Sequence, residues 1–218
     1  MKTTKEKDCR YEGLEETSQS NPFIRLDQIN EVRKSRHKLL LHSCCGPCST
    51  AVVERLTGRF DITIFFYNPN IADQEEYGKR RAAQLDFIEK YNDRIDARDR
   101  IAYLEGPFEP ELFCQAVKGM EHEPEGGKRC TSCFQLRLEK TAETAKMSGF
   151  DTFSTTLSVS PHKNFELIHK LGMQLGMRYG LSFLGEDFKK QGGYQRSVEL
   201  SKEYGLYRQR FCGCSYAK

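Results

Sequence analysis

The sequence has no apolar run approaching the ~20 residues that a membrane-spanning helix needs. Its first residues, MKTTKEKDCRYEGLEE, are polar and charged, and they contain no apolar segment of the kind found in secretory signals. Internal repeats and low-complexity segments are absent as well. We therefore expect a protein without a membrane partner, working in the reducing cytoplasm.

A glycine-rich phosphate loop is also missing. In many open α/β sheets such a loop follows the first strand, but here the apolar run 39–41 leads directly into HSCCGPCST. This absence argues against an ATP-dependent tRNA-modifying enzyme, which the sheet architecture would otherwise allow. The loop contains Cys44, Cys45 and Cys48 instead, and thiolates are strong ligands for soft metals. We expect this loop to hold metal and the other cysteines to converge on it.

Nine cysteines in 218 residues are too few for a disulfide scaffold, and their odd number argues against complete pairing. In a reducing compartment, clustered cysteines indicate metal binding or catalysis. The net charge of +3 permits a nucleic-acid partner without requiring one, because a clustered basic patch matters more than the total.

Strand-like and helix-like segments alternate along the chain, which is typical of βαβ units with a mostly parallel sheet. The β-branched and apolar runs predict strands at 39–41, 61–67, 101–104, 151–159 and 181–184. The segments between them predict helices at 51–56, 75–91, 108–118, 134–147 and 165–177. We expect one α/β domain over 37–218, with a polar N-terminal extension over 1–36 and a basic, loop-rich C-terminal tail that contains cysteines.

Polar loops follow three of the predicted strands. They are the cysteine loop, the turn Asn68-Pro69-Asn70 and the segment 160–164. Because the carboxyl ends of parallel strands lie along one edge of a sheet, these loops should line one crevice.

The pair Cys130-x-x-Cys133 is a good half-site for a metal centre at the start of a helix. Four thiolates are the usual complement of a structural zinc or an iron–sulfur cluster. Adjacent cysteines such as Cys44 and Cys45 are awkward around a tetrahedral zinc and suit the separated iron corners of a larger cluster. The spacing therefore favours iron–sulfur over zinc.

The remaining cysteines have less certain surroundings. Cys212 and Cys214, at the end of the basic tail, form either a redox-active pair or ligands of a second metal, and Cys48 could complete either arrangement. Cys114 is expected to pack in the core on a predicted helix. Cys9 is remote in sequence from every other thiol, which favours a bystander role.

Several rare motifs in a fixed order give the chain a specific resemblance. They are HSCCGPCS, FFYNPNI, EYGKR, EGGKRCTSCFQLRLEKTA, STTLSVSPHK, GGYQRS and LYRQRFCGC. From about Leu39 to Tyr216, the chain resembles the QueH-type epoxyqueuosine reductases. The resemblance implies a Rossmann-like fold of the adenine-nucleotide-hydrolase type that lacks its ATP loop. It also implies a 4Fe-4S cluster beside a second metal ion, which we expect to be iron.

The resemblance also assigns roles to the cysteines. It implies that the cluster is held by Cys44, Cys45, Cys130 and Cys133. It implies that the second metal, and with it catalysis, is served by Cys48, Cys212 and Cys214. The implied reaction removes the epoxide oxygen from epoxyqueuosine at the wobble position of tRNA, which gives queuosine.

A two-electron deoxygenation needs a cofactor and an electron donor, since no side chain supplies such electrons unaided. The donor is not identifiable from the sequence. Candidates for the proton donor are His42, His162 and Asp187, although a histidine beside a strand end is as often a hydrogen-bonded core residue.

The modified base must leave the anticodon stack to reach a buried metal. Candidate phosphate contacts are Arg80, Arg81, Lys163, Lys189, Lys190, Arg196, Arg208 and Arg210. The run 189–210 is the strongest basic patch, because it precedes the terminal cysteines. Tyr67 and Tyr194 are candidates for stacking on bases, and Asn68 and Asn70 for hydrogen bonds to the substrate.

Two other classes of protein compete with the reductase. A zinc-binding RNA or protein adaptor would be colourless and would contain stoichiometric zinc. A thiol–disulfide oxidoreductase would work without metal and would leave the adjacent Cys44 and Cys45 unexplained. The reductase would instead be brown and oxygen-sensitive, with iron and sulfide.

Overall fold

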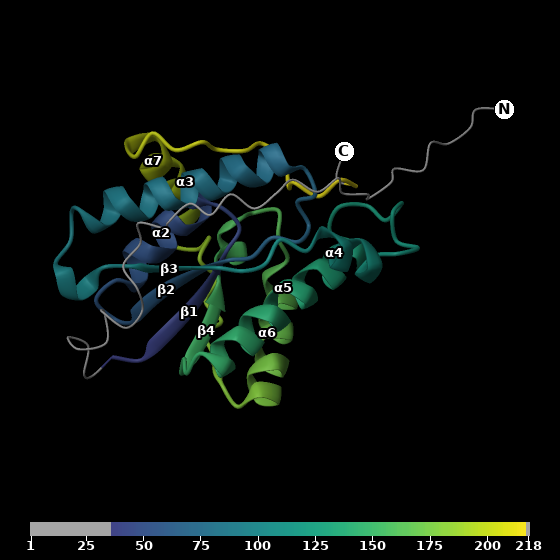
Figure 1. The fold of residues 1–218 in the computed structure, drawn as a ribbon, viewed down its shortest axis with the longest axis horizontal. Coiled ribbons are helices and arrows are strands. Elements are labelled where there is room, and N and C mark those ends of the chain that lie inside the picture. The colour runs from purple at the N-terminus through teal and green to yellow at the C-terminus, as the bar shows by residue number, and fades with distance from the viewer. Residues whose placement is uncertain (1–35, 217–218) are drawn as a thin grey trace.

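The structure is a computed structural model that describes residues 36–216, and its centre is a sheet of five parallel strands in the order β3-β2-β1-β4-β5 (Figure 1). The strands are β1 (Lys38–Ser43), β2 (Asp61–Phe66), β3 (Ala102–Glu105), β4 (Thr152–Thr155) and β5 (Ser182–Phe183). The predicted α/β fold with a parallel sheet is confirmed. The expected extension over 1–36, with Cys9, lies almost wholly outside the described residues.

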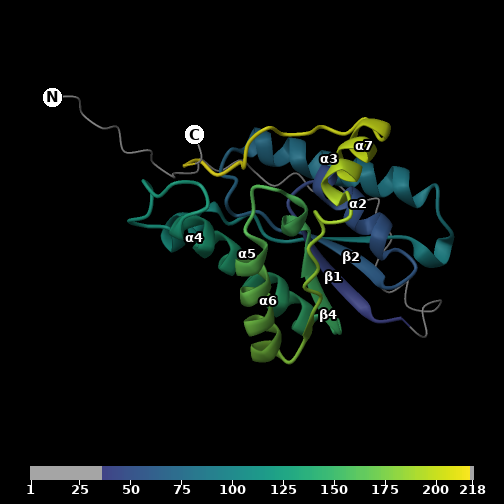
Figure 2. The ribbon, with the colours of Figure 1, turned by 180° about the vertical axis from the view of Figure 1, so that it is seen from behind.

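Helices cover both faces of the sheet (Figures 1 and 2). One face carries α2 (Gly46–Leu56), α3 (Gln74–Asn92) and α7 (Gly193–Glu203), and the other carries α5 (Lys128–Met147) and α6 (Phe165–Tyr179). The short helix α4 (Pro110–Ala116) packs on α5, and two 3-10 helices span Ala97–Asp99 and Thr156–Val159. Because Leu39 and Leu41 face one helical layer and Leu40 the other, all three are fully buried, and β1 reads as an unbroken apolar run.

Several predicted boundaries are wrong, and one helix was not predicted; helix α2, for example, begins at Gly46, not at 51. The fourth strand ends at Thr155, not at 159, because the Thr155 hydroxyl accepts the amide of Leu157 and starts a 3-10 turn. Helix α5 begins six residues before the predicted start at 134, so Cys130 and Cys133 both lie in its first two turns. Helix α7 lies in the tail that the sequence indicated as loop, and its buried face consists mostly of glycine and serine, which give no apolar period.

The strand order fixes where a site can form. β1 lies between β2 and β4, so the chain leaves β1 toward one side of the sheet and later returns on the other. In open α/β sheets this reversal opens a crevice outside the carboxyl ends of the strands. The cysteine loop follows β1 directly at this point. A membrane-crossing helix, which would need greater length and apolarity, is not found among the described residues.

Gly46 gives a direct test of the packing between α2 and α3. A Cβ atom on Gly46 would lie 2.2 Å from the backbone oxygen of Ala83, so Gly46→Ala forces the two helices apart. We expect the free energy of unfolding to fall by about 1–3 kcal/mol in urea titrations. The matched control is Gly78→Ala on α3, where a Cβ atom meets nothing within 4 Å. That variant should be neutral or up to ~1 kcal/mol more stable, and equal losses in both variants would contradict the close approach.

Candidate metal centre

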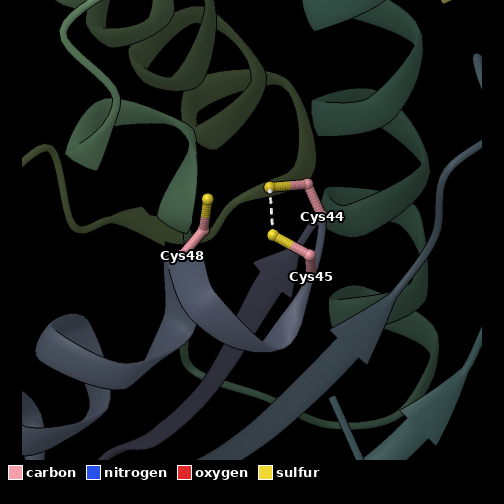
Figure 3. A group of neighbouring side chains, drawn as sticks. All are labelled: Cys44, Cys45 and Cys48. Atoms are coloured by element: carbon pink, nitrogen blue, oxygen red, sulfur yellow. Dashed lines mark hydrogen bonds between the residues drawn. The ribbon is translucent and has the colours of Figure 1, made fainter. Parts of the chain in front are cut away.

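Three thiols meet where β1 passes into α2. The sulfur atoms of Cys44, Cys45 and Cys48 all lie within 4.8 Å of one another, and those of Cys44 and Cys45 are 3.7 Å apart (Figure 3). Cys45 is the extended residue just before α2, and Cys48 lies in the first turn of that helix. Across residues 36–216, this thiol triad is the one group of three His, Cys, Asp or Glu side chains found close enough to share a metal ion.

The three sulfurs of the thiol triad shift one another's pKa values in opposite directions. Hydrogen bonds from Cys45 and Cys48, and the nearby Arg137 charge, hold the pKa of Cys44 well below its usual range. Burial, and then the bond to Cys44, raises the pKa of Cys45 to about 12. Hydrogen bonding to the other two sulfurs also raises the pKa of Cys48. Cys44 is therefore the sulfur of the triad that loses its proton most readily, and the thiols of Cys45 and Cys48 would release protons on binding a metal.

A buried cation lies beside these sulfurs. Arg137 is only 3% exposed, and it lies on α5 one turn after Cys133. Its Nη2 donates to Oδ1 of Asn68 at 2.6 Å, and its Nε donates to Nε2 of His42 at 3.2 Å. The Asn68 amide in turn donates to the carbonyl oxygen of Ser43 at 3.1 Å. These bonds join α5, the turn after β2 and the end of β1.

Cysteines are the titratable groups that act most strongly on the charge of Arg137. No ion pair between Arg137 and a carboxylate is found within the described part of the chain. Burial alone would lower the pKa of Arg137, but Cys133, Cys44 and Cys212 outweigh it and raise that pKa. The guanidinium therefore remains charged, and it favours thiolates around it.

The other two predicted cluster ligands, Cys130 and Cys133, lie in the first two turns of α5, ahead of Arg137 on the same helix. Cys133 is 7% exposed and packs with Phe113 and Val117, and burial raises its pKa to about 11. The sulfur of Cys130 accepts the backbone amide of Gly126 at 3.2 Å. One cysteine from each half of the predicted four-cysteine set, Cys44 and Cys133, thus acts on the charge of Arg137, but among the described residues neither Cys130 nor Cys133 belongs to a group close enough to share a metal ion. The complete ligand set of Cys44, Cys45, Cys130 and Cys133 stays a prediction.

The C-terminal tail lies across the same edge. Nε2 of Gln209 donates to the sulfur of Cys45 at 2.9 Å, and Nζ of Lys163 donates to the sulfur of Cys212 at 3.3 Å. Cys214 packs against the cluster that contains Cys133. Cys212 and Cys214 thus approach the predicted cluster ligands, and Cys48 lies with Cys44 and Cys45. Whether these three hold a second metal stays a prediction.

The candidate proton donors have different surroundings. His42 is fully buried. Its Nδ1 lies 2.8 Å from the Thr155 hydroxyl, and its Nε2 lies 3.0 Å from the carbonyl oxygen of Tyr67 and 3.2 Å from Nε of Arg137. It is a structural residue. His162 is exposed. Asp187 pairs with Nζ of Lys189 at 3.1 Å, and its role stays a prediction.

Some candidate contacts with RNA are wrong. Tyr67 is fully buried and donates its hydroxyl to Glu109 at 3.1 Å, so it cannot stack on a base. Arg80 is 2% exposed in a pair with Glu76 and is closed to phosphate.

Cys114, which was expected to pack in the core, is half-buried on α4.

Arg137 and Gln209 were not among the expected site residues. The signal for Arg137 was available, because it follows Cys133 by four residues and so shares its face of a helix that also buries Leu138. Nothing local marks Gln209, whose bond to Cys45 spans 164 residues.

His42 should make stability depend on pH. Burial first, and the Arg137 charge second, lower its pKa from 6.5 to about 3. The unfolded chain therefore binds this proton at a higher pH than the folded chain. The contribution of His42 is complete above pH 6.5 and is lost as the pH falls toward 3. In that window we expect up to about 1.4 kcal/mol of stability lost per pH unit from this residue.

The measurement is urea unfolding of the metal-free protein between about pH 7 and pH 4. The comparison variant is His42→Gln, whose amide can accept from Arg137 and donate to Thr155 without titrating. Its stability should fall less steeply with acidification than that of the wild type. Identical slopes would show that His42 is not held neutral.

Comparisons with known proteins place this arrangement in a family. Residues 39–218 match the family described as Epoxyqueuosine reductase QueH. The chain is 45% identical to the epoxyqueuosine reductase QueH of Staphylococcus epidermidis, over 84% of this chain and 76% of that protein. It is 42% identical to the one of Streptococcus pyogenes, over 87% and 74%, and 38% identical to the one of Thermotoga maritima, over 82% and 89%. With a family match across nearly the whole described domain, this chain belongs to the QueH family of epoxyqueuosine reductases.

Proposed function

We propose that this protein reduces epoxyqueuosine to queuosine at the wobble position of tRNA in the cytoplasm, with a 4Fe-4S cluster held by Cys44, Cys45, Cys130 and Cys133. The observation that carries the proposal is the thiol triad at the carboxyl end of β1, together with the buried Arg137, whose charge interacts with both Cys44 and Cys133. The family membership supports the substrate, since the relatives named above are epoxyqueuosine reductases.

The donor set fits the proposed cofactors. All the candidate ligands are sulfur, which suits iron–sulfur chemistry better than magnesium or calcium. The permanent charge of Arg137 favours an anionic metal–thiolate centre over neutral thiols. When bound, the cluster would supply electrons, and a second metal, proposed as iron at Cys48, Cys212 and Cys214, would supply Lewis acidity.

The overall reaction consumes two electrons and two protons. The two C–O bonds of the epoxide break, its oxygen leaves as water, and a carbon–carbon double bond remains. The electrons come from a separate donor. Asp187 is the proposed source of a proton for the departing oxygen. It lies near the carboxyl edge of β4, because the amide of the next residue, Phe188, donates to the hydroxyl of Ser158 in the turn after that strand.

The tRNA would approach over the basic tail. Arg208 is half-buried and Arg210 exposed, and Tyr194 is 40% exposed. The Arg208 guanidinium lies 5.6 Å from the ring centre of Tyr194, so the two side chains present a charge beside an aromatic face. Base flipping would then bring the modified nucleobase to the carboxyl edge of the sheet.

Metal analysis tests the cluster ligands. Protein purified without oxygen should be brown and contain sulfide and about four cluster irons per chain. Cys44→Ser and Cys130→Ser should each lose the visible absorbance, because each removes a corner ligand. Cys114→Ser is the matched control, and its absorbance should match the wild type. A band that survives either ligand substitution refutes the assignment, and a colourless wild type with stoichiometric zinc would favour an adaptor.

The tail cysteines should act separately from the cluster. Cys212→Ser and Cys214→Ser should each reduce epoxyqueuosine turnover by at least about a hundredfold, because each removes a ligand of the proposed second metal. The cluster absorbance should stay near that of the wild type. Turnover is followed by mass analysis of nucleosides from treated tRNA. Normal turnover in both variants would exclude a catalytic role for the tail.

A further inference from the structure

Arg80 connects α3 to the end of the chain. The residue is 2% exposed, and its Nε donates to Oε1 of Glu76 one turn earlier on α3, at 2.6 Å. Glu76 is 7% exposed, and its other oxygen accepts the hydroxyl of Tyr207 at 2.8 Å. The ion pair is therefore enclosed between the helix and the tail.

The far end of the Arg80 side chain binds the tail itself. Nη1 donates to the carbonyl oxygen of Cys212 at 3.0 Å, and Nη2 donates to that of Phe211 at 3.2 Å. The guanidinium carbon also lies 5.3 Å from the centre of the Phe211 ring. Only the planar fork of arginine can serve a carboxylate and two successive carbonyls at once.

The glycine between the tail cysteines matches this contact. Gly213 has φ +87°, a conformation that side chains with a Cβ atom rarely adopt. A Cβ atom there would lie 2.7 Å from Nη2 of Arg80. The segment Cys212-Gly213-Cys214 thus bends around the guanidinium. The absence of a side chain at Gly213 allows both the turn and the close approach of Arg80.

Side-chain contacts hold the tail on either side of this point: Gln209 donates to the sulfur of Cys45, and Nη2 of Arg129 donates to the carbonyl oxygen of Tyr216 at 3.2 Å. Residues 207–214 form no helix or strand, and Phe211 is 54% exposed. Yet Cys212 is brought to 3.3 Å from Nζ of Lys163, and Cys214 packs beside Cys133. A segment with so few backbone ladder bonds depends on side-chain contacts for its position.

We propose that Arg80 is a positioning residue that fixes the tail segment Phe211–Cys214 at the edge of the thiol site. It sets where Cys212 and Cys214 lie and has no contact with the thiol triad. The proposal rests on the proposed function only in what the two thiols are positioned for. The fixing of the tail itself is independent of any metal.

The test compares Arg80→Lys with Arg81→Lys in the full-length, metal-free protein. Lysine keeps the charge near Glu76 but cannot bond both carbonyls, whereas Arg81 is the adjacent residue and pairs with Glu105 away from the tail. Cleavage by trypsin after Arg210, followed by mass spectrometry, should be roughly tenfold or more faster in Arg80→Lys than in wild type or Arg81→Lys. If folded Arg80→Lys protein is cleaved at a rate within about twofold of the rates of wild type and Arg81→Lys, the proposal is overturned.

A variant on the tail side covers the case in which Arg80→Lys fails to fold. Gly213→Ala leaves α3 unchanged, and its Cβ atom should displace the guanidinium and speed cleavage after Arg210 in the same way. Unchanged cleavage in Gly213→Ala also overturns the proposal.

Iron analysis of anaerobically loaded protein separates the two proposals. If Arg80→Lys keeps the cluster absorbance but loses the iron of the proposed second metal site, the result supports both the proposed function and the positioning role of Arg80. If the wild-type protein binds no iron, the proposed function fails. Faster cleavage of Arg80→Lys would then still support the positioning role. Full retention of the additional iron together with slow cleavage refutes the positioning role alone.

Discussion

The structure around the site depends on one buried positive charge. A guanidinium without water is unfavourable unless acceptors and negative charge surround it. Arg137 obtains two neutral acceptors, Asn68 and His42, and its charge faces the sulfurs of Cys44, Cys133 and Cys212. The dependence is mutual at Cys44, whose pKa the Arg137 charge helps to lower.

The sheet explains why these groups meet. Both faces of the sheet are covered by helices, so only its edges can receive polar chemistry. At the carboxyl edge, β1 supplies His42 and the cysteine loop, β2 supplies Asn68, and β4 supplies Thr155 as a partner of His42. Helix α5 then brings Arg137 and Cys133 over this edge from one face. The site is therefore a consequence of strand order, in which the three central strands, β2, β1 and β4, or the turns that follow them, supply its hydrogen-bonding partners.

Those parts of the fold and site were predictable in which a local sequence pattern reflects the burial of a strand on both faces of the sheet. The unbroken run Leu39–Leu41 and the thiols after it identified the first strand and the site, since their spacing alone carries the signal. The end of β4 was not predictable, because a side-chain hydroxyl of Thr155 competes with the strand ladder. Helix α7 was not predictable from an apolar period, because two of the residues that it buries are Ser197 and Ser201 and no apolar stripe appears in the sequence.

Contacts between distant segments set the remaining limit, and they also make stability uneven across the site. The bonds of Arg80 to the tail span 131 and 132 residues, and no local period records such a pairing. The thiol triad and Cys133 are held by a strand, two helices and the core, so they persist as long as the domain is folded. The tail is held by side-chain donors such as Arg80, Gln209 and Lys163, and local opening of such a segment costs less than unfolding the domain. The site thus combines one half that is fixed by the strand and helices of the fold with a tail that is held by side-chain contacts.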